Sequence, residues 1–231
     1  MFLLQSTTEA FNIVLAILLL IASYILGSIP FGVLIGKSRD IDIREHGSKN
    51  IGTTNSIRVL GKKLGFTVFF FDVFKGMAVI LLIKLLAALN VWSSPIDLLW
   101  YGALAIIGHS FSMFLEFEGG KAVATSLGVV LVLCPLAAIA CLLIFFITLI
   151  ITGYVSLGST FASLTVVLTG WVLYFINFQS SNAFSVLIAS PGLAVCILFT
   201  IATALIIIKH TKNYKRLLNG TENSFKKKKT D

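Results

Sequence analysis

The clearest shortage in this chain is of charge. Asp, Glu, Lys and Arg make up only 12% of its 231 residues, about half of the quarter that is usual for a soluble protein. Hydrophobic residues make up 57%, and the mean hydropathy is +0.98. The apolar runs are too long and unbroken for the alternating strands of a membrane barrel. The composition therefore excludes an ordinary soluble domain and predicts an all-α integral membrane protein.

Cysteine and acidic residues are also scarce, which excludes several kinds of site. The three cysteines lie inside hydrophobic runs, and none has metal-ligand spacing with a histidine or another cysteine. The few carboxylates show no paired metal spacing, and the spaced aspartates of the CDP-alcohol phosphotransferases are absent. The His-x4-Asp arrangement that one class of acyltransferases uses is absent too, because Ile51, Phe114 and Lys215 stand where the aspartate would follow each histidine. We therefore expect no metal and no cofactor.

The net charge of +8 comes from basic residues that flank the hydrophobic runs. Apart from Lys84 they fall in three clusters, a distribution typical of membrane topology and of contact with anionic headgroups rather than of a nucleic-acid surface. By the positive-inside rule, the loop at 37–63 and the tail at 209–231 are expected to be cytoplasmic. The first ten residues carry no positive charge, so we expect the N-terminus outside and no signal peptide.

The number of spans follows from the basic tail. Six spans would leave that tail outside, against the positive-inside rule, whereas a break at Pro135 gives seven spans and a cytoplasmic C-terminus. Two of the seven would be short, which is tolerated where other helices cover them. We expect one polytopic domain over residues 1–231, with spans at about 11–36, 65–89, 98–114, 124–134, 136–152, 160–176 and 184–208.

The longest stretch without hydrophobic periodicity is residues 46–58. It reads His-Gly-Ser-Lys-Asn-Ile-Gly-Thr-Thr-Asn-Ser-Ile-Arg. Backbone N–H groups near glycines, short hydroxyl and amide side chains and a guanidinium together suit an oxyanion such as phosphate. A second stretch, residues 119–125, reads Gly-Gly-Lys-Ala-Val-Ala-Thr and resembles a phosphate-binding loop without matching a Walker A motif. Both stretches fall on the cytoplasmic side of the expected topology.

Other polar residues fall on the same expected face. Asp72 and Lys75 lie three residues apart near the inner end of the second span, either as a self-satisfied pair or as a brace for the polar loop. Ser156 lies in a cytoplasmic turn, and His210 and Asn213 share a helix face if the start of the tail is helical. Together these groups predict an interfacial site for one or two phosphates, with an acyl chain supplied by the bilayer. His109, at a helix end, is expected to be structural.

These separated motifs resemble the bacterial acyl-phosphate:glycerol-3-phosphate acyltransferase family in order and nearly from end to end. The motifs are Gly27–Gly32, the 46–58 loop, Phe71–Gly76, Gly108-His109, Gly119–Thr125, Tyr154–Ser156 and residues 210–222. The resemblance implies a seven-helix enzyme of the bacterial inner membrane, with its site on the cytoplasmic face. It implies transfer of a fatty acyl group from acyl phosphate to the sn-1 hydroxyl of glycerol 3-phosphate, giving lysophosphatidic acid and phosphate. We expect a monomer whose other partners are membrane lipids.

By position in the family motifs, the resemblance implies catalytic roles for Ser48, Arg58, Lys121 and His210. Lys121 and Arg58 would neutralise the departing phosphate, and either His210 or the phosphate of the substrate would act as the base. Substrate-binding roles are implied for the same four residues and for Asn50, Thr54, Asn55, Gly119, Gly120, Thr125, Ser156 and Asn213.

Three residues depart from the family pattern. The family usually has glycine at Lys49 and Ala122 and alanine at Thr53. Because an alanine side chain disfavours a positive φ, we expect the backbone at Ala122 to be helical or extended. A transporter for a phosphorylated solute is the alternative function, and a structural scaffold is a third. The spans carry few charges near the bilayer midplane, which argues against a transporter, and a scaffold would not explain four polar motifs on one face.

Overall fold

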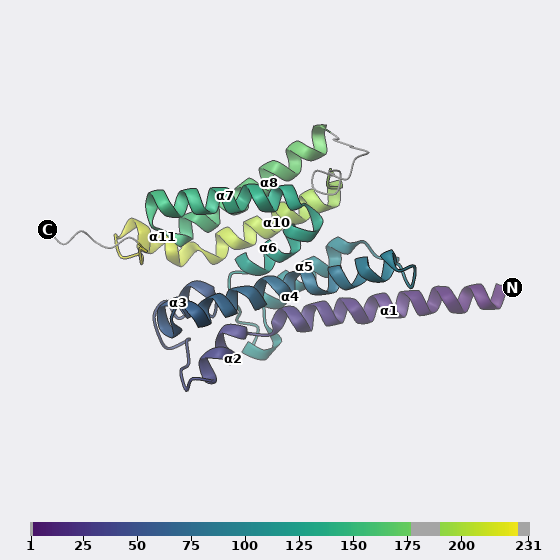
Figure 1. Ribbon diagram of the computed structural model, residues 1–231, viewed down its shortest axis with the longest axis horizontal. Coiled ribbons are helices and arrows are strands. Elements are labelled where there is room, and N and C mark those ends of the chain that lie inside the picture. Colours follow the sequence, from purple (N-terminus) through teal and green to yellow (C-terminus); the bar gives the residue numbers. More distant parts are fainter. Residues whose placement is uncertain (1, 177–189, 226–231) are drawn as a thin grey trace. The chain divides into compact units, whose positions relative to one another are not determined.

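The computed structural model describes residues 2–176 and 190–225, and within these ranges all regular structure is helical (Figure 1). The chain divides into two compact units, Met1–Val132 and Leu133–Asp231. The polar connector expected after residue 176, the start of the span expected at 184–208 and the lysines at 226–229 lie outside the described residues.

The first unit is built on three long helices and the shorter elements between them. Its helices are α1 (Phe2–Ser28), α2 (Phe31–Lys37), α3 (Thr53–Leu60), α4 (Lys62–Ala88), α5 (Leu98–Ser110), the 3₁₀ turn η1 (Met113–Leu115) and α6 (Val123–Leu133). Helices α1, α4 and α5 pack side by side (Figure 1). The chain breaks between α1 and α2 at Ile29 and Pro30, because proline cannot donate the next helical hydrogen bond.

Glycines allow two of these helix pairs to approach closely. A side chain at Gly27 would meet the backbone of Ala105, and one at Gly108 would meet the backbone of Tyr24, so α1 and α5 touch through their main chains. Gly128 of α6 lies in the same way against the backbone of Val73 in α4. Small residues at such crossings are typical of membrane helices, where close packing replaces the hydrophobic effect.

The second unit contains α7 (Pro135–Thr152), α8 (Val155–Ile176), α10 (Leu193–Lys209) and α11 (Thr211–Leu218). Pro135 begins α7 at the first helical position, where its missing N–H has no cost. Gly153 ends the same helix with a φ of 78°, a left-handed cap that glycine adopts without strain. Helix α8 packs against α7 and α10, and the chain bends by 49° between α10 and α11.

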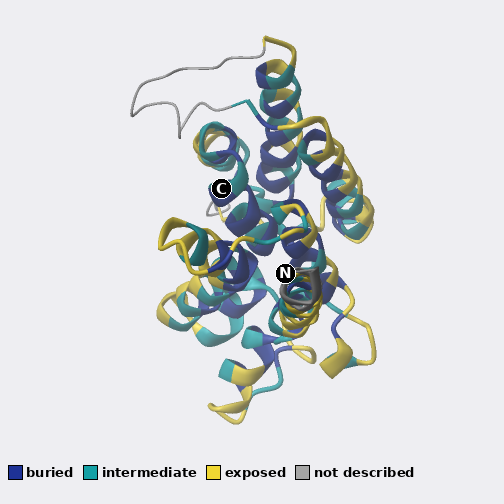
Figure 2. Cartoon of the chain, turned by 90° about the vertical axis from the view of Figure 1, so that its right-hand side faces the viewer, coloured by how far each residue is buried: buried dark blue, intermediate teal, exposed yellow. Residues whose placement is uncertain are grey.

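Five described helical segments are long and apolar enough to cross a bilayer, or six if α10 and the bent α11 count as one. Their outward faces carry large exposed apolar side chains such as Phe70, Ile150 and Phe175. Figure 2 shows that buried and exposed residues occupy different faces of the helices. Lipid is the solvent that suits such faces. Helix α6, with 11 residues, is apolar but shorter than the roughly 20 residues of a full span. The molecule is an all-α integral membrane protein.

Candidate functional site

The polar 46–58 loop rests on a small apolar cluster in the first unit. Ile43 and Ile51, on either side of the loop's first half, are buried against Val33 of α2. Gly32 of α2 leaves room for the carbonyl of Ile51, which a side chain there would strike. Since its flanks are buried in this way, the loop is held in one conformation and differs from a solvated connector.

Asn55 organises the inside of the loop. Its side chain is 1% exposed, and its Oδ1 accepts a hydrogen bond from the backbone N–H of Ser48 at 2.8 Å. Its Nδ2 donates to the carbonyls of Ile43 at 2.9 Å and His46 at 3.1 Å. One buried amide on α3 therefore satisfies three backbone groups in the irregular segment that precedes this helix. Asn55 acts as the internal support of this loop.

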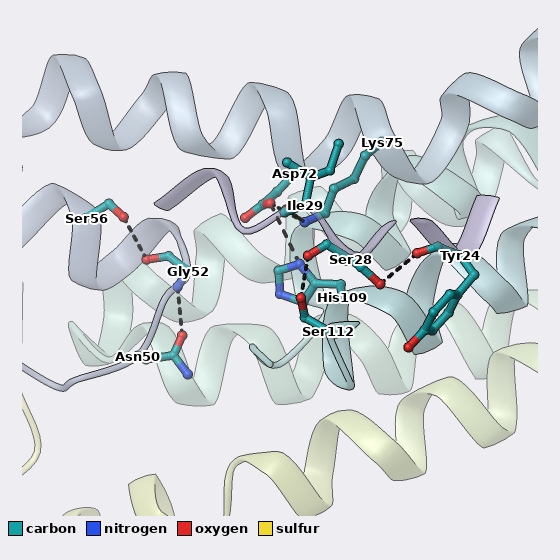
Figure 3. Close-up of polar contacts among 10 residues, drawn as sticks. All are labelled: Tyr24, Ser28, Ile29, Asn50, Gly52, Ser56, Asp72, Lys75, His109 and Ser112. Carbon is teal, nitrogen blue, oxygen red and sulfur yellow. Dashed lines mark hydrogen bonds and ion pairs between the residues drawn. The ribbon is translucent and has the colours of Figure 1, made fainter. Parts of the chain in front are cut away.

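The entry to α3 is fixed by two further polar contacts (Figure 3). The Oδ1 of Asn50 accepts from the backbone N–H of Gly52 at 2.9 Å, and the hydroxyl of Ser56 donates to the carbonyl of Gly52 at 3.2 Å. Thr54 and Arg58 follow on α3, both half-buried. Of the residues expected in a site, the structure thus brings Ser48, Asn50 and Asn55 into one hydrogen-bonded loop that leads into the helix carrying Thr54 and Arg58.

Lys49 occupies a left-handed backbone position with a φ of 60°, two residues after Gly47 at 61°. Its backbone N–H donates to the carbonyl of His46 at 3.0 Å, which closes a tight turn, and its side chain is exposed. A glycine adopts this conformation without steric cost, whereas another residue pays about 1 kcal/mol or more. The turn gives a physical reason for glycine at this position in the family pattern.

The glycine-rich stretch, residues 119–122, folds back on the end of α5. The backbone N–H of Gly119 donates to the carbonyl of Ser110 at 3.2 Å, and that of Gly120 donates to the carbonyl of His109 at 3.0 Å. Lys121 follows, half-buried. Thr125 and Ser126 lie buried in the first turn of α6, and their hydroxyl oxygens have no hydrogen-bond partner within the described part of the chain. Buried hydroxyls are normally bonded, so these two are candidates to bind a ligand or an ordered water molecule.

The expectation for Ala122 is wrong. Its φ is 57°, in the left-handed region, rather than helical or extended. The residue is fully buried, and its carbonyl accepts the first hydrogen bond of α6 from the N–H of Ser126 at 2.7 Å. The local chain path into α6 sets the backbone here, and surrounding packing offsets a strain of about 1–2 kcal/mol.

Asp72 and Lys75 form a buried ion pair on α4, with Nζ and Oδ1 2.8 Å apart and both side chains at most 3% exposed. Lys75 also donates to the carbonyl of Ile29 at 2.8 Å, at the break between α1 and α2 (Figure 3). Nearby, the hydroxyl of Ser112 donates to the carbonyl of Ser28 at 2.5 Å. The pair is therefore not self-contained. It holds the α1–α2 segment, which in turn carries the apolar support of the 46–58 loop.

In the second unit, the carboxylate of Glu222 accepts hydrogen bonds from three side chains. Its Oε1 accepts from the amide of Asn213 at 2.7 Å and from the hydroxyl of Ser156 at 3.1 Å. Its Oε2 accepts from Arg216 at 2.7 Å. Two expected site residues, Ser156 at the start of α8 and Asn213 on α11, are thus joined through a third residue. His210 lies buried at the α10–α11 bend, where its Nδ1 is 2.8 Å from the carbonyl of Ile206.

The hydrogen bonds decide the ionisation of Glu222. Burial alone would raise its pKa, but the bonds from Asn213, Arg216 and Ser156, together with the positive charge of Arg216, hold the pKa below its ordinary value. The carboxylate is therefore ionised at neutral pH and cross-links α8 to the C-terminal segment. A backbone bond from Phe225 to the carbonyl of Gly153, at 2.9 Å, closes the same segment onto the α7–α8 turn.

Sequence reasoning missed the central role of Glu222. A signal was available, because it is the only acidic residue between Glu118 and Asp231, in a stretch rich in lysine. The contact between Asp72 and His109 was also missed. The Nδ1 of His109, on α5, is 3.7 Å from Oδ1 of Asp72, and only the fold brings the two helices together.

The polar loops rest on helices whose apolar faces suit a lipid bilayer, and this arrangement defines an integral membrane protein. The comparisons with known proteins agree with that class. A family model described as glycerol-3-phosphate acyltransferase matches residues 17–220. A glycerol-3-phosphate acyltransferase of Acholeplasma laidlawii is 40% identical, over 92% of this chain and 94% of its own. One of Bacillus velezensis is 41% identical, over 90% of this chain and 97% of its own.

Solved structures agree with the sequence matches. The crystal structure of PlsY, an integral membrane glycerol 3-phosphate acyltransferase, in its glycerol 3-phosphate form has a TM-score of 0.76 and 35% identity. The match covers 91% of this chain and 96% of that one. The lysophosphatidic acid form of the same protein gives a TM-score of 0.74. The chain belongs to the glycerol-3-phosphate acyltransferase family.

Proposed function

We propose that this protein transfers a fatty acyl group from acyl phosphate to the sn-1 hydroxyl of glycerol 3-phosphate. The observation that carries the proposal is the family match over residues 17–220, together with a likeness to a structure solved in its glycerol 3-phosphate form. The products are lysophosphatidic acid and inorganic phosphate. This is the first acylation of phospholipid synthesis, and it uses no metal or other cofactor.

In the proposed reaction, the acceptor hydroxyl attacks the carbonyl carbon of the acyl phosphate. A new ester C–O bond forms, the C–O bond to phosphate breaks, and the hydroxyl proton passes through a base to the phosphate that leaves. Phosphate is a good leaving group in such a mixed anhydride, so positioning and charge neutralisation carry most of the catalysis. His210 or the phosphate of the substrate serves as the base.

The residues of the first unit have the chemistry to bind phosphate. Lys121 and Arg58 supply positive charge, and Ser48 and Thr54 supply hydroxyls beside backbone N–H groups. Thr125 adds a buried hydroxyl that has no hydrogen-bond partner among the described residues. In the second unit, Ser156, His210 and Asn213 contribute to binding or proton transfer. The remaining substrate contacts in this proposal come from Asn50, Asn55, Gly119 and Gly120.

We further propose seven membrane spans in the bacterial inner membrane, with the N-terminus outside and the site residues on the cytoplasmic face. The basic clusters at 37–63 and 209–231 support this orientation. Single cysteines introduced at Ser93 and Lys212, with the three native cysteines replaced, would test it with a membrane-impermeant maleimide. In intact cells we expect the reagent to label the Ser93→Cys variant and not the Lys212→Cys variant. The opposite result would show that the proposed orientation is inverted.

The decisive test of function is direct. Purified protein in lipid nanodiscs would be given radiolabelled glycerol 3-phosphate with either acyl phosphate or acyl-coenzyme A. Lysophosphatidic acid and phosphate are expected in equal amounts from acyl phosphate. Product from acyl-coenzyme A alone would overturn the donor, and no product from either would overturn the proposed function. Uptake of the label into sealed vesicles without acylation would favour a transporter instead.

A further inference from the structure

A buried chain of polar groups links the α1–α2 break to the helices α4 and α5 of the first unit (Figure 3). It runs from the carbonyl of Ile29 to Lys75 of α4 at 2.8 Å, and from Lys75 to Asp72 at 2.8 Å. Oδ1 of Asp72 also lies 3.7 Å from Nδ1 of His109 on α5, an approach longer than a hydrogen bond, and the His109 side chain is only 4% exposed. Charged groups inside a membrane helix are costly, so such a chain is rarely incidental.

His109, the last member of this series of polar groups, lies directly against residues 119–122. The carbonyl of His109 accepts the N–H of Gly120 at 3.0 Å, and the imidazole lies where a side chain at residue 120 would be, next to Nε2. Gly120 has no positive φ, unlike Gly47, Gly61, Gly153 and Gly220 among the described glycines. The ring of His109, rather than the backbone conformation, therefore excludes a side chain at this position.

Resting on the proposed function, we propose that Asp72, Lys75 and His109 are positioning residues for the phosphate-binding stretch at 119–122. The ion pair and the bond from Lys75 to Ile29 hold α4 against the α1–α2 break. Asp72 orients the imidazole of His109, and the imidazole fixes the position of the Gly120 backbone. Gly120 in turn sets the direction of the backbone that carries Lys121. None of the three touches the reacting atoms in this proposal, and their effect is carried by the loop.

A second lysine on the same helix provides a matched control. Lys84 also donates from Nζ to a backbone carbonyl, that of Val132 at 3.2 Å, but its side chain is exposed and it lies at the other end of α6 from the glycine-rich stretch. Changes at Lys84 and Lys75 remove the same group from the same helix. Only the change at Lys75 should disturb the loop.

The test is a double-mutant cycle on the full-length enzyme in nanodiscs, measuring kcat and the KM for each substrate. His109→Ala and Gly120→Ala are each expected to raise the KM for one phosphate-bearing substrate at least tenfold, with kcat changed less than threefold. In the double variant the new methyl group occupies the space left by the imidazole. Its KM should therefore fall at least threefold below the product of the two single effects. If the KM of the double variant rises by the full product of the two single effects, the proposal is overturned. KM values within twofold of wild type in both single variants would also overturn it.

A neutral pair separates positioning from folding. Asp72→Asn with Lys75→Met removes both charges together and leaves no uncompensated buried ion. We expect a tenfold or larger rise in the same KM, while Lys84→Met leaves it within twofold. If the neutral pair unfolds the protein, the cycle at His109 and Gly120 still decides. Wild-type protein without any product would instead be a failure of the proposed function, whereas an active wild type with unaltered KM in every variant would refute the positioning role alone.

Discussion

The two units stabilise their polar loops in opposite ways. In the first unit the 46–58 loop is organised around a neutral amide, that of Asn55, and the charged side chains Arg58 and Lys121 lie half-buried at the loops. In the second unit three donors, Ser156, Asn213 and Arg216, converge on the carboxylate of Glu222. The first arrangement places the positive charges of Arg58 and Lys121 beside loops built from neutral polar groups. The second supplies its own anion.

This difference suggests separate roles for the two sets of groups, phosphate binding in the first unit and structural support in the second. A neutral internal support lets a loop hold its shape while the net positive charge around it attracts phosphate. A charged internal support consumes donors, so Ser156 and Asn213 are engaged by the protein before any substrate arrives. Substitution of Arg58 or Lys121 should therefore act chiefly on substrate affinity and turnover, and substitution of Glu222 itself chiefly on stability.

Removal of the Lys121 ammonium is expected to have the largest effect on catalysis. Lys121→Ala should lower kcat/KM by about 10²–10³-fold, the usual result of deleting one preorganised donor at a developing charge. Lys212→Ala removes the same charge from an exposed position on α11 and should leave turnover within about twofold. The measurement is the steady-state rate of lysophosphatidic acid formation. Equal losses in both variants would mean that only net charge matters, and unchanged turnover in Lys121→Ala would remove its proposed role.

Replacement of Glu222 should reduce stability more than turnover. Glu222→Gln keeps the shape of the side chain but loses the charge that strengthens three hydrogen bonds, each worth about 1.5–3 kcal/mol when an ion takes part. Thermal unfolding in detergent at pH 7 should show a clear drop in Tm, while kcat at a permissive temperature should change less than tenfold. Thr165→Ala, which removes an exposed hydroxyl bond within α8, serves as the control.

The effect of Glu222 should also depend on pH with a defined sign. Its pKa is lowered in the folded protein from an ordinary 4.5, so its stabilisation is fully present above that ordinary value. The stabilisation is lost as the pH falls through the lower folded value. The difference in Tm between wild type and Glu222→Gln should therefore be constant near neutrality and vanish in acid. A difference that grew in acid would contradict the lowered pKa.

Asn55 offers a subtler test of the neutral support. Asn55→Asp retains the acceptor for Ser48 N–H but loses the two N–H bonds to Ile43 and His46. The carbonyl of His46 still accepts from the N–H of Lys49, whereas the buried carbonyl of Ile43 loses its bond at a cost of about 1–3 kcal/mol. The new negative charge also repels phosphate. We expect a lower Tm and a higher KM for a phosphate substrate in the same variant. Asn50→Asp keeps the oxygen that accepts from the N–H of Gly52. This variant should therefore show the rise in KM caused by the new negative charge, with little change in Tm.

The sequence predicted the class of the fold, but it did not predict which side chains would meet, and the roles given to single residues stay predictions. Hydropathy and the missing charges predicted a helical membrane protein, because burial in lipid demands long apolar helices. Lys121, Ser48 and Asn55 could be chosen from their chemistry and motif positions. The proximity of Asp72 to His109, on different helices, depends on tertiary packing that no local pattern encodes. Glu222 was overlooked because its partners are 6 to 66 residues away.

Ala122 shows the limit of the local rules most clearly, and it carries the smallest expected effect. A buried alanine with a φ of 57° stores strain of about 1–2 kcal/mol, whereas glycine loses about 0.5–1 kcal/mol through its freer unfolded chain. Ala122→Gly should therefore raise stability by at most about 1 kcal/mol. The same change two residues later, Ala124→Gly inside helix α6, should lower stability by about 0.5–1 kcal/mol. Opposite signs in the two Tm shifts would establish the left-handed conformation in solution. A loss at both positions would mean that residue 122 is helical or extended after all.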